Sequence, residues 1–143
     1  MELDRLHGPH SVPLLLDTLA DPRESTEVRI DVLKRLRDER LLPEYRGLVA
    51  KAILQLIADR STPELRLQAV LALAEFADVE GVPTALGGLA LDPDEPIDVR
   101  YSAFTSLQRA GPTTDCVALL RQLLTDEALG PCTRSVLSLW RLE

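Results

Sequence analysis

The chain has 143 residues, and 45% of them are hydrophobic, which is enough for an ordinary core in a chain of single-domain length. Its net charge of −7 argues against a duplex-binding domain, because such domains gather positive charge against phosphates. Aromatic residues make up only 3%, and no stretch shows sustained strand-like alternation, so we expect an all-α chain with an aliphatic core.

The first ten residues are expected to form an irregular lead-in. The acidic start Met1–Arg5 is unlike a secretory leader, and no apolar run is long enough to span a bilayer. We therefore expect a cytoplasmic protein without a membrane segment. His7 and His10 could contribute to a metal site, but no cysteine or carboxylate cluster accompanies them.

Two helical pairs are expected in the first half of the chain. Ser11 suits an N-cap for a helix over residues 12–20, and a turn at residues 21–25 leads to a helix over residues 26–37. A longer helix is expected over residues 43–58. The residues expected on the inner faces of the second and third helices are Val28, Val32, Leu33, Leu36, Leu48, Ala52, Ile53, Leu56 and Ile57.

Residues 62–77 are expected to form the helix around which the chain is organised. Thr62 can accept a hydrogen bond from a free backbone N–H as the N-cap, and Pro63 suits the first helical position. Apolar residues then recur at steps of three and four, the spacing of an amphipathic helix. These residues are Leu65, Ala69, Val70, Leu73 and Phe76.

Two further pairs are expected in the second half. The predicted helices cover residues 82–91, 97–109, 115–124 and 132–142. Gly87 and Gly88 weaken the first of them, and paired glycines mark a bend or a close helix contact. Cys116 and Cys132 are expected to be buried reduced thiols, with a disulfide bridge or a metal role as the alternative.

The helical pairs form a repeat. Val28-Arg29, Leu65-Arg66 and Val99-Arg100 each begin a helix, at spacings of 37 and 34 residues. The turn of each pair contains an aspartate, and these are Asp21, Asp59, Asp92 and Asp126. A period in this range built from two helices indicates an α-solenoid, in which each pair is stabilised by stacking on its neighbours. We expect one domain over residues 1–143, with repeats at about residues 12–40, 41–79, 80–111 and 112–143.

The fourth repeat fits the pattern poorly. Aligning Arg134 with Arg100 would put Arg141 on a core column. We prefer an alignment shifted by one residue, in which Thr133 replaces the arginine. This alignment puts four residues on the apolar columns, namely Cys132, Val136, Leu137 and Trp140. Trp140 would then cover the last repeat, with a dimer contact as the alternative.

The turn aspartate, the Val/Leu-Arg pair and the small residue and leucine that follow resemble HEAT repeats, especially the short repeats of bacterial proteins and phycobilisome lyases. The resemblance covers about residues 12–142 and implies a superhelix of four helix–turn–helix repeats. It also implies a structural ladder of hydrogen bonds between turn aspartates and helix arginines. The ladder residues would be Asp21, Arg29, Asp59, Arg66, Asp92 and Arg100. A row of arginines that grips an anionic ligand is the alternative.

The second helices of such repeats usually line the concave face on which partners bind, so the resemblance implies a non-catalytic scaffold for a protein or peptide. Positions one and five after each arginine point away from the core and should be polar on a solvated face. Several hold apolar residues instead, namely Ile30, Leu67, Leu71 and Tyr101. This stripe is either packed against a neighbouring repeat or a groove for an extended peptide or a partner helix. We predict the binding site there, with a polar rim of Gln68, Glu75 and Gln108.

Three other functions are alternatives. The resemblance suggests, as the first, that the chain is a relative of bilin lyases or isomerases. The second is nucleic-acid binding through the basic segment Lys34–Lys51, with the residues Lys34, Arg35, Arg37, Arg40, Arg46 and Lys51. The third is that the acidic segment Glu75–Asp98 makes the chain an antagonist of a basic protein.

The sequence contains no motif that indicates catalysis. A calcium site is an alternative at four acidic residues, namely Asp92, Asp94, Glu95 and Asp98. The stretch lacks the glycine and the closing glutamate of an EF-hand loop. We predict no catalytic residue, no cofactor and no metal.

Overall fold

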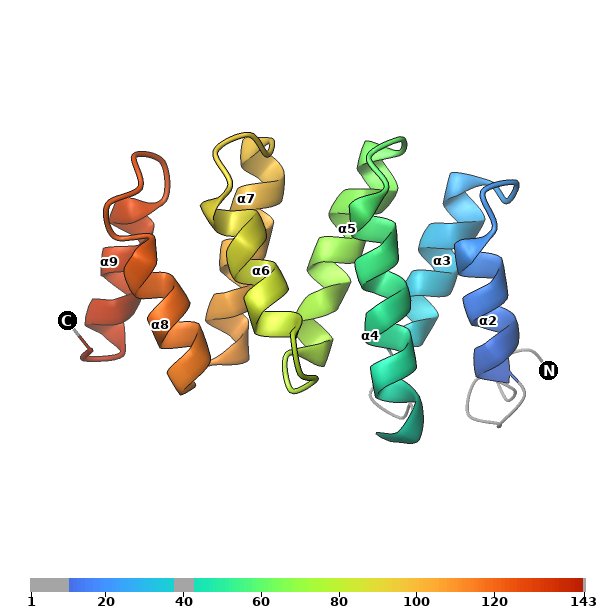
Figure 1. Cartoon of the computed structure of the whole chain (residues 1–143), viewed down its shortest axis with the longest axis horizontal. Helices are drawn as coiled ribbons and strands as arrows, with labels where there is room; N and C mark the ends of the chain where they lie inside the picture. Colours follow the sequence, from blue (N-terminus) through green and yellow to red (C-terminus); the bar gives the residue numbers. More distant parts are fainter. Residues whose placement is uncertain (1–10, 38–42, 143) are drawn as a thin grey trace. The chain divides into compact units, whose positions relative to one another are not determined.

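The computed structural model describes residues 11–37 and 43–142, and within these two stretches all regular structure is helical. The elements in chain order are α2 (Ser11–Ala20), α3 (Thr26–Leu36), α4 (Pro43–Ala58), α5 (Pro63–Leu73), the 3-10 helix η1 (Ala74–Phe76), α6 (Val82–Leu91), α7 (Ile97–Ala110), α8 (Thr114–Gln122) and α9 (Gly130–Leu139) (Figure 1). The predicted fold class, an all-α chain of helix–turn–helix repeats, is confirmed. The bounds of α4 and α6 are as predicted, and the other helices differ by a few residues at their ends.

The chain divides into two compact units, residues 1–79 and 80–143, and each unit contains two helical pairs. In the first unit α2 packs against α3 and α4 against α5, and the two pairs meet through α2 with α4 and α3 with α5. In the second unit α6 packs against α7 and α8 against α9, while α8 contacts both α6 and α7. Within each unit the pairs therefore lie side by side, as solenoid repeats do. The single domain over residues 1–143 stays a prediction.

The interior is aliphatic, as the composition predicts. The leucine seven residues after each of the first three repeat arginines belongs to it: Leu36, Leu73 and Leu107 are all 0% exposed. Burying one leucine side chain stabilises a fold by about 1.5–3 kcal/mol. This repeated leucine column is therefore a main source of stability in both units.

Three side chains that were predicted to be buried are exposed. Val28 is 42% and Leu48 is 55% exposed, and the thiol of Cys132 is exposed too, whereas that of Cys116 is buried. A helix turns by about 100° per residue, so an error of one position moves a side chain from the core to solvent. In α4, for example, Val49 is buried in place of Leu48.

Thr62 is the N-cap residue of α5, as predicted, but the predicted hydrogen bond is wrong, because its side chain makes no capping bond. The backbone of Thr62 has a ψ of 89°. Ser25 and Thr113, whose side chains do make capping hydrogen bonds, have a fully extended backbone with ψ of 152° and 159°. Extended backbone is what aims a capping oxygen at the free N–H groups of the first turn.

The two glycines of α6 have different surroundings. A Cβ atom on Gly87 would lie 2.5 Å from Cδ2 of Leu119 on α8, whereas one on Gly88 would meet no atom within 4 Å. Gly87 therefore allows α6 and α8 to approach closely, and this is the close helix contact that the glycine pair predicted.

Candidate functional site

The repeat arginines Arg29, Arg66 and Arg100 are buried near the start of their helices, with 6–7% of each residue exposed. In each, Nε donates a hydrogen bond to a main-chain carbonyl at the end of the preceding helix. The pairs are Arg29 with Leu19 at 2.8 Å, Arg66 with Ile57 at 2.6 Å and Arg100 with Ala90 at 2.9 Å. The last carbonyls of a helix have no partner within it, so these bonds satisfy groups that would otherwise be unpaired.

The four turn aspartates share a second local role. Each carboxylate accepts the backbone N–H two residues further on, which is the geometry of an Asx turn. The pairs are Asp21 with Arg23 at 2.9 Å, Asp59 with Ser61 at 2.9 Å, Asp92 with Asp94 at 2.9 Å and Asp126 with Ala128 at 2.8 Å.

Hydrogen bonds to the charged carboxylate hold the pKa of three of these aspartates below the ordinary value. The largest cause is the backbone N–H of Arg23 for the pKa of Asp21, and the side-chain hydroxyl of Ser61 for that of Asp59. For the pKa of Asp126 the largest cause is the backbone N–H of Leu129. The turns are therefore built around ionised carboxylates.

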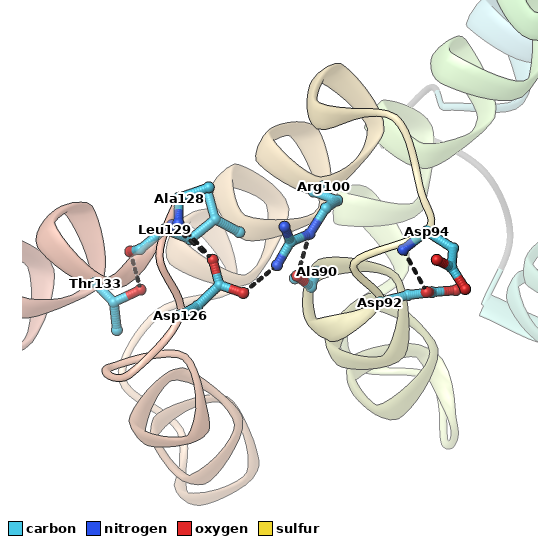
Figure 2. A network of polar contacts seen from close by, with 8 residues as sticks. All are labelled: Ala90, Asp92, Asp94, Arg100, Asp126, Ala128, Leu129 and Thr133. Atoms are coloured by element: carbon cyan, nitrogen blue, oxygen red, sulfur yellow. Dashed lines mark hydrogen bonds and ion pairs between the residues drawn. The ribbon is translucent and has the colours of Figure 1, made fainter.

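In the second unit a repeat arginine also reaches the turn of the next pair. Nη2 of Arg100 donates to Oδ2 of Asp126 while its Nε is bonded to Ala90 (Figure 2). One guanidinium therefore joins the end of α6 to the turn between α8 and α9. The side chains of Arg100 and Asp126 are 8% and 18% exposed, and a charge-assisted bond is strong in such surroundings.

The fourth pair lacks this arginine. Thr133 stands in its place and is 0% exposed, whereas Arg134 is exposed, which confirms the preferred alignment. The Thr133 hydroxyl donates to the carbonyl of Leu129, the N-cap residue of α9, at 2.8 Å (Figure 2). A Cβ atom on Gly130 would lie only 2.6 Å from the carbonyl oxygen of Leu124. The start of α9 therefore lies directly against the carbonyl that corresponds to Ala90 of the third pair.

The structure places four of the predicted partner-binding residues on two contacting helices of the first unit. Ile30 lies on α3, and Leu67, Gln68 and Leu71 lie on α5; all four are half-buried. Leu67 and Leu71 are one helical turn apart. Two of the remaining predicted residues lie on α7 in the second unit.

On α7 Tyr101 is 52% exposed, and its ring centroid lies 5.9 Å from that of Phe104. Gln108, two turns further along the same helix, is half-buried. Tyr101 therefore presents an accessible aromatic ring that is supported from one side by a buried one.

Within the first unit the basic and acidic segments contact each other. Nη2 of Arg37 donates to Oε1 of Glu75, a predicted rim residue, at 3.3 Å. Arg46 donates to the carboxylate of Asp78 and, at 2.6 Å, to the main-chain carbonyl of Glu75. Its guanidinium also lies 4.8 Å from the ring centroid of Phe76. The hydrogen bond from Arg46 is the largest cause that lowers the pKa of Asp78.

These contacts weaken the nucleic-acid alternative. Arg35 is paired as well, with Asp31 one turn earlier on α3 at 3.2 Å, so three arginines of the basic segment have carboxylate partners. Lys34 and Lys51 are exposed, and Arg40 lies outside the described residues. The same pairs engage acidic groups that an antagonist of a basic protein would need.

The calcium alternative gains no support from the geometry. Glu95 is only 7% exposed, and Asp92 is engaged in its own turn. Among residues 11–37 and 43–142 no group of three or more His, Cys, Asp or Glu side chains is placed to hold a metal ion. His7 and His10 lie outside these residues.

Sequence reasoning missed two of these interactions. Asp126 as the partner of Arg100 could have been found, because it follows Asp92 by one repeat of 34 residues. The contact between Arg46 and Asp78 has no local signal, since the two residues are 32 positions apart and neither belongs to the repeated pattern.

In the described part of the chain no helix is both long and apolar enough to cross a membrane.

The comparison with known proteins identifies a family. The searches of curated proteins and of solved structures found no match. A family model described as HEAT repeats matches residues 50–139, which is more than half of the chain, and this match does not identify the phycobilisome-lyase type. The chain belongs to the HEAT-repeat family.

Proposed function

We propose that this chain is a non-catalytic interaction module that binds a protein or peptide along the second helices of its repeats. HEAT repeats typically serve as protein-interaction scaffolds. The proposal rests on one observation: Leu67 and Leu71 are only half-buried on α5, although the other apolar positions of that helix are buried.

The α5 surface has the properties of a helix-in-groove or peptide-binding site. A solvated helix face is normally polar, yet here two leucines one turn apart are accessible, with Ile30 half-buried on the adjacent α3. Apolar anchors at this spacing are what a partner helix or an extended peptide contacts. Gln68 on α5 and Glu75 on η1, the 3-10 helix that continues α5, supply polar groups beside these leucines in sequence.

In the second unit we propose a separate contact point at Tyr101 on α7. Tyrosine combines a large apolar ring with a hydroxyl, and such residues contribute strongly to interface energies. Gln108 on the same helix would supply a polar contact beside it. We place this role in the cytoplasm, the compartment in which free thiols such as Cys116 and Cys132 persist.

We also propose that the six ladder residues are structural and bind no ligand. They are Asp21, Arg29, Asp59, Arg66, Asp92 and Arg100. In support, the three arginines are buried and bonded to main-chain carbonyls, whereas an anion-binding row would need accessible guanidinium groups. Arg29 and Asp59 do line a common cavity, but its volume of about 130 Å³ is small for a ligand pocket.

The test uses the double variant Leu67→Ser, Leu71→Ser. Its matched control is Leu48→Ser, which removes a leucine that is 55% exposed on α4 of the same unit. Partners are identified by affinity purification from the native host with mass spectrometry, and their binding is then measured with purified proteins. We expect the wild type and the control to bind a partner that the double variant no longer binds. The melting temperature of the double variant should equal that of the wild type. Loss of stability in the double variant would show that the leucines are packing residues, and unchanged binding would contradict the proposed site.

A further inference from the structure

A hollow of about 410 Å³ opens in the second unit, lined by residues of α8, α9 and the segments that follow them. Its apolar lining comes from Leu124, Leu137 and Leu142, and two cations, Arg121 and Arg134, lie beside them. Its volume falls in the usual range for small-ligand sites, about 300–1,000 Å³. Neither the repeat pattern nor the proposed α5 surface involves this hollow.

One wall of the hollow is built by the turn that ends α9. Arg141 has a φ of 61°, in the left-handed region that side-chain-bearing residues rarely adopt. The turn is closed by hydrogen bonds from the N–H of Arg141 to Ser138 at 2.9 Å and from the N–H of Leu142 to Leu137 at 2.8 Å. These two bonds form a Schellman motif, a common way in which helices end, and the motif brings Leu142 back beside Leu137.

Arg121 holds this turn in place from α8. Its Nη2 donates to the carbonyl of Leu142 at 3.0 Å, which fixes Leu142 in the wall of the hollow. The remaining N–H groups of the guanidinium are additional donors. Arg121 therefore both shapes the hollow and brings positive charge to it.

The two arginines of the hollow form no ion pair within the described residues. Neither Arg121 nor Arg134 has a carboxylate partner there, unlike Arg46 and Arg100, which form ion pairs. Asp126, an acidic residue of the preceding turn, is already bonded to Arg100. In a chain of net charge −7, two guanidinium groups without a carboxylate partner among the described residues, set beside an apolar lining, complement an anion that carries an apolar group.

We propose that this hollow binds a short segment of a partner protein in which a leucine-type side chain adjoins a carboxylate. The apolar side chain enters between the three leucines, and the carboxylate accepts hydrogen bonds from Arg134 and Arg121. A guanidinium is suited to this role because its planar fork matches the two carboxylate oxygens. The proposal goes beyond the α5 surface and stands whether or not that surface binds a partner.

The test is an NMR titration of the ¹⁵N-labelled full chain with three blocked tetrapeptides at millimolar concentration. The first contains leucine followed by glutamate, the second leucine followed by glutamine, and the third alanine followed by glutamate. We expect the first to shift the amide signals of Leu124, Leu137 and Leu142, and to bind at least about tenfold more tightly than the other two, because each control lacks one of the two groups. Equal binding of all three, or shifts elsewhere only, would overturn the proposal.

Variants locate the site. Arg134 is exposed, so Arg134→Gln leaves the fold intact and should weaken the leucine–glutamate peptide by about tenfold. Arg23→Gln is the matched control, since the Arg23 side chain is 90% exposed and lies in the other unit. Leu142→Ser keeps both cations and should weaken binding by removing the apolar wall. Unchanged affinity in Arg134→Gln would refute the assignment. The double variant Leu67→Ser, Leu71→Ser should bind the peptide normally, which separates this test from that of the α5 surface.

Discussion

The second unit contains the third and fourth helical pairs of the chain, and the two pairs fix the start of their second helix with different residues. In the third pair a long charged side chain, Arg100, bonds to the end of α6 and to Asp126 of the next pair. In the fourth pair Thr133 bonds only to the N-cap residue of its own helix, and Gly130 brings the backbone itself against the carbonyl of Leu124, which follows α8. The arginine therefore connects neighbouring pairs, whereas the threonine and glycine serve one pair alone.

The same contrast appears seven residues later. Leu107 of the third pair is fully buried, whereas Trp140 of the fourth pair is only half-buried. Within the second unit α7 packs against both α6 and α8, whereas α9 packs mainly against α8. We therefore expect substitutions in the third pair to destabilise the protein more than equivalent ones in the fourth.

The largest effect is expected for Leu107→Ala. It should lower the free energy of unfolding by about 2–5 kcal/mol, because it removes buried methyl groups and leaves a cavity. The measurement is urea denaturation followed by circular dichroism. Leu139→Ala on α9 is the control; that side chain is 74% exposed, so its effect should be below about 0.5 kcal/mol. Equal effects of the two would contradict the role of Leu107 in the core of the third pair.

Arg100→Met should lower the free energy of unfolding by about 2–3 kcal/mol, since it removes a charge-assisted bond and leaves the Ala90 carbonyl without its donor. Methionine preserves much of the apolar stem, so the loss reports mainly on the guanidinium. Arg134→Met, at an exposed position of the fourth pair, should change stability by less than about 0.5 kcal/mol. If Arg100→Met were neutral, the connection between the pairs would contribute nothing to stability.

Gly130→Ala should destabilise the fourth pair by about 1–3 kcal/mol, because the new Cβ would lie 2.6 Å from a main-chain oxygen that cannot move independently. Gly88→Ala is the matched control, since that helical glycine has open space around it. Alanine there should stabilise α6 by up to about 1 kcal/mol. Thermal melts of the two variants should therefore shift in opposite directions, and a shift in the same direction would contradict the close backbone contact.

Most of the helical architecture could be predicted because its determinants are local. Prolines at helix starts and the steps of three and four place α4 and α6 at their observed bounds. The repeated arginines could be found from their spacing, and the replacement of one of them by Thr133 from the same alignment. What a repeated pattern fixes is the position of a residue relative to its own helix.

The rest depends on geometry that no pattern contains. The exposure of Val28 and Leu48 follows from the rotation of each helix against its neighbours, and the missing capping bond at Thr62 follows from one ψ angle. The contact of Arg46 with Asp78 joins positions that are distant in the chain. The hollow beside α9 could not be foreseen, because its wall depends on the left-handed turn at Arg141.

The smallest expected effect concerns pH and the partner of Arg100. The pKa of Asp126 is lowered chiefly by the N–H of Leu129, and also by the bond from Arg100. A carboxyl whose pKa is lower in the folded state stabilises the fold above its unfolded pKa of about 3.9, and this contribution is lost as the pH falls through the folded pKa. The difference in unfolding free energy between wild type and Asp126→Asn should therefore be constant near neutral pH and shrink below about pH 4.

The control for this pH series is Thr133→Val, which removes the polar group that occupies the arginine position in the fourth pair. Neither residue titrates, so the difference in unfolding free energy between wild type and this variant should not change with pH. Urea denaturation of all three proteins between about pH 3 and pH 7 provides the measurement. An Asp126→Asn difference that stayed constant over this range would mean that the carboxylate gains nothing on folding. The connection between the third and fourth pairs would then be carried by packing alone.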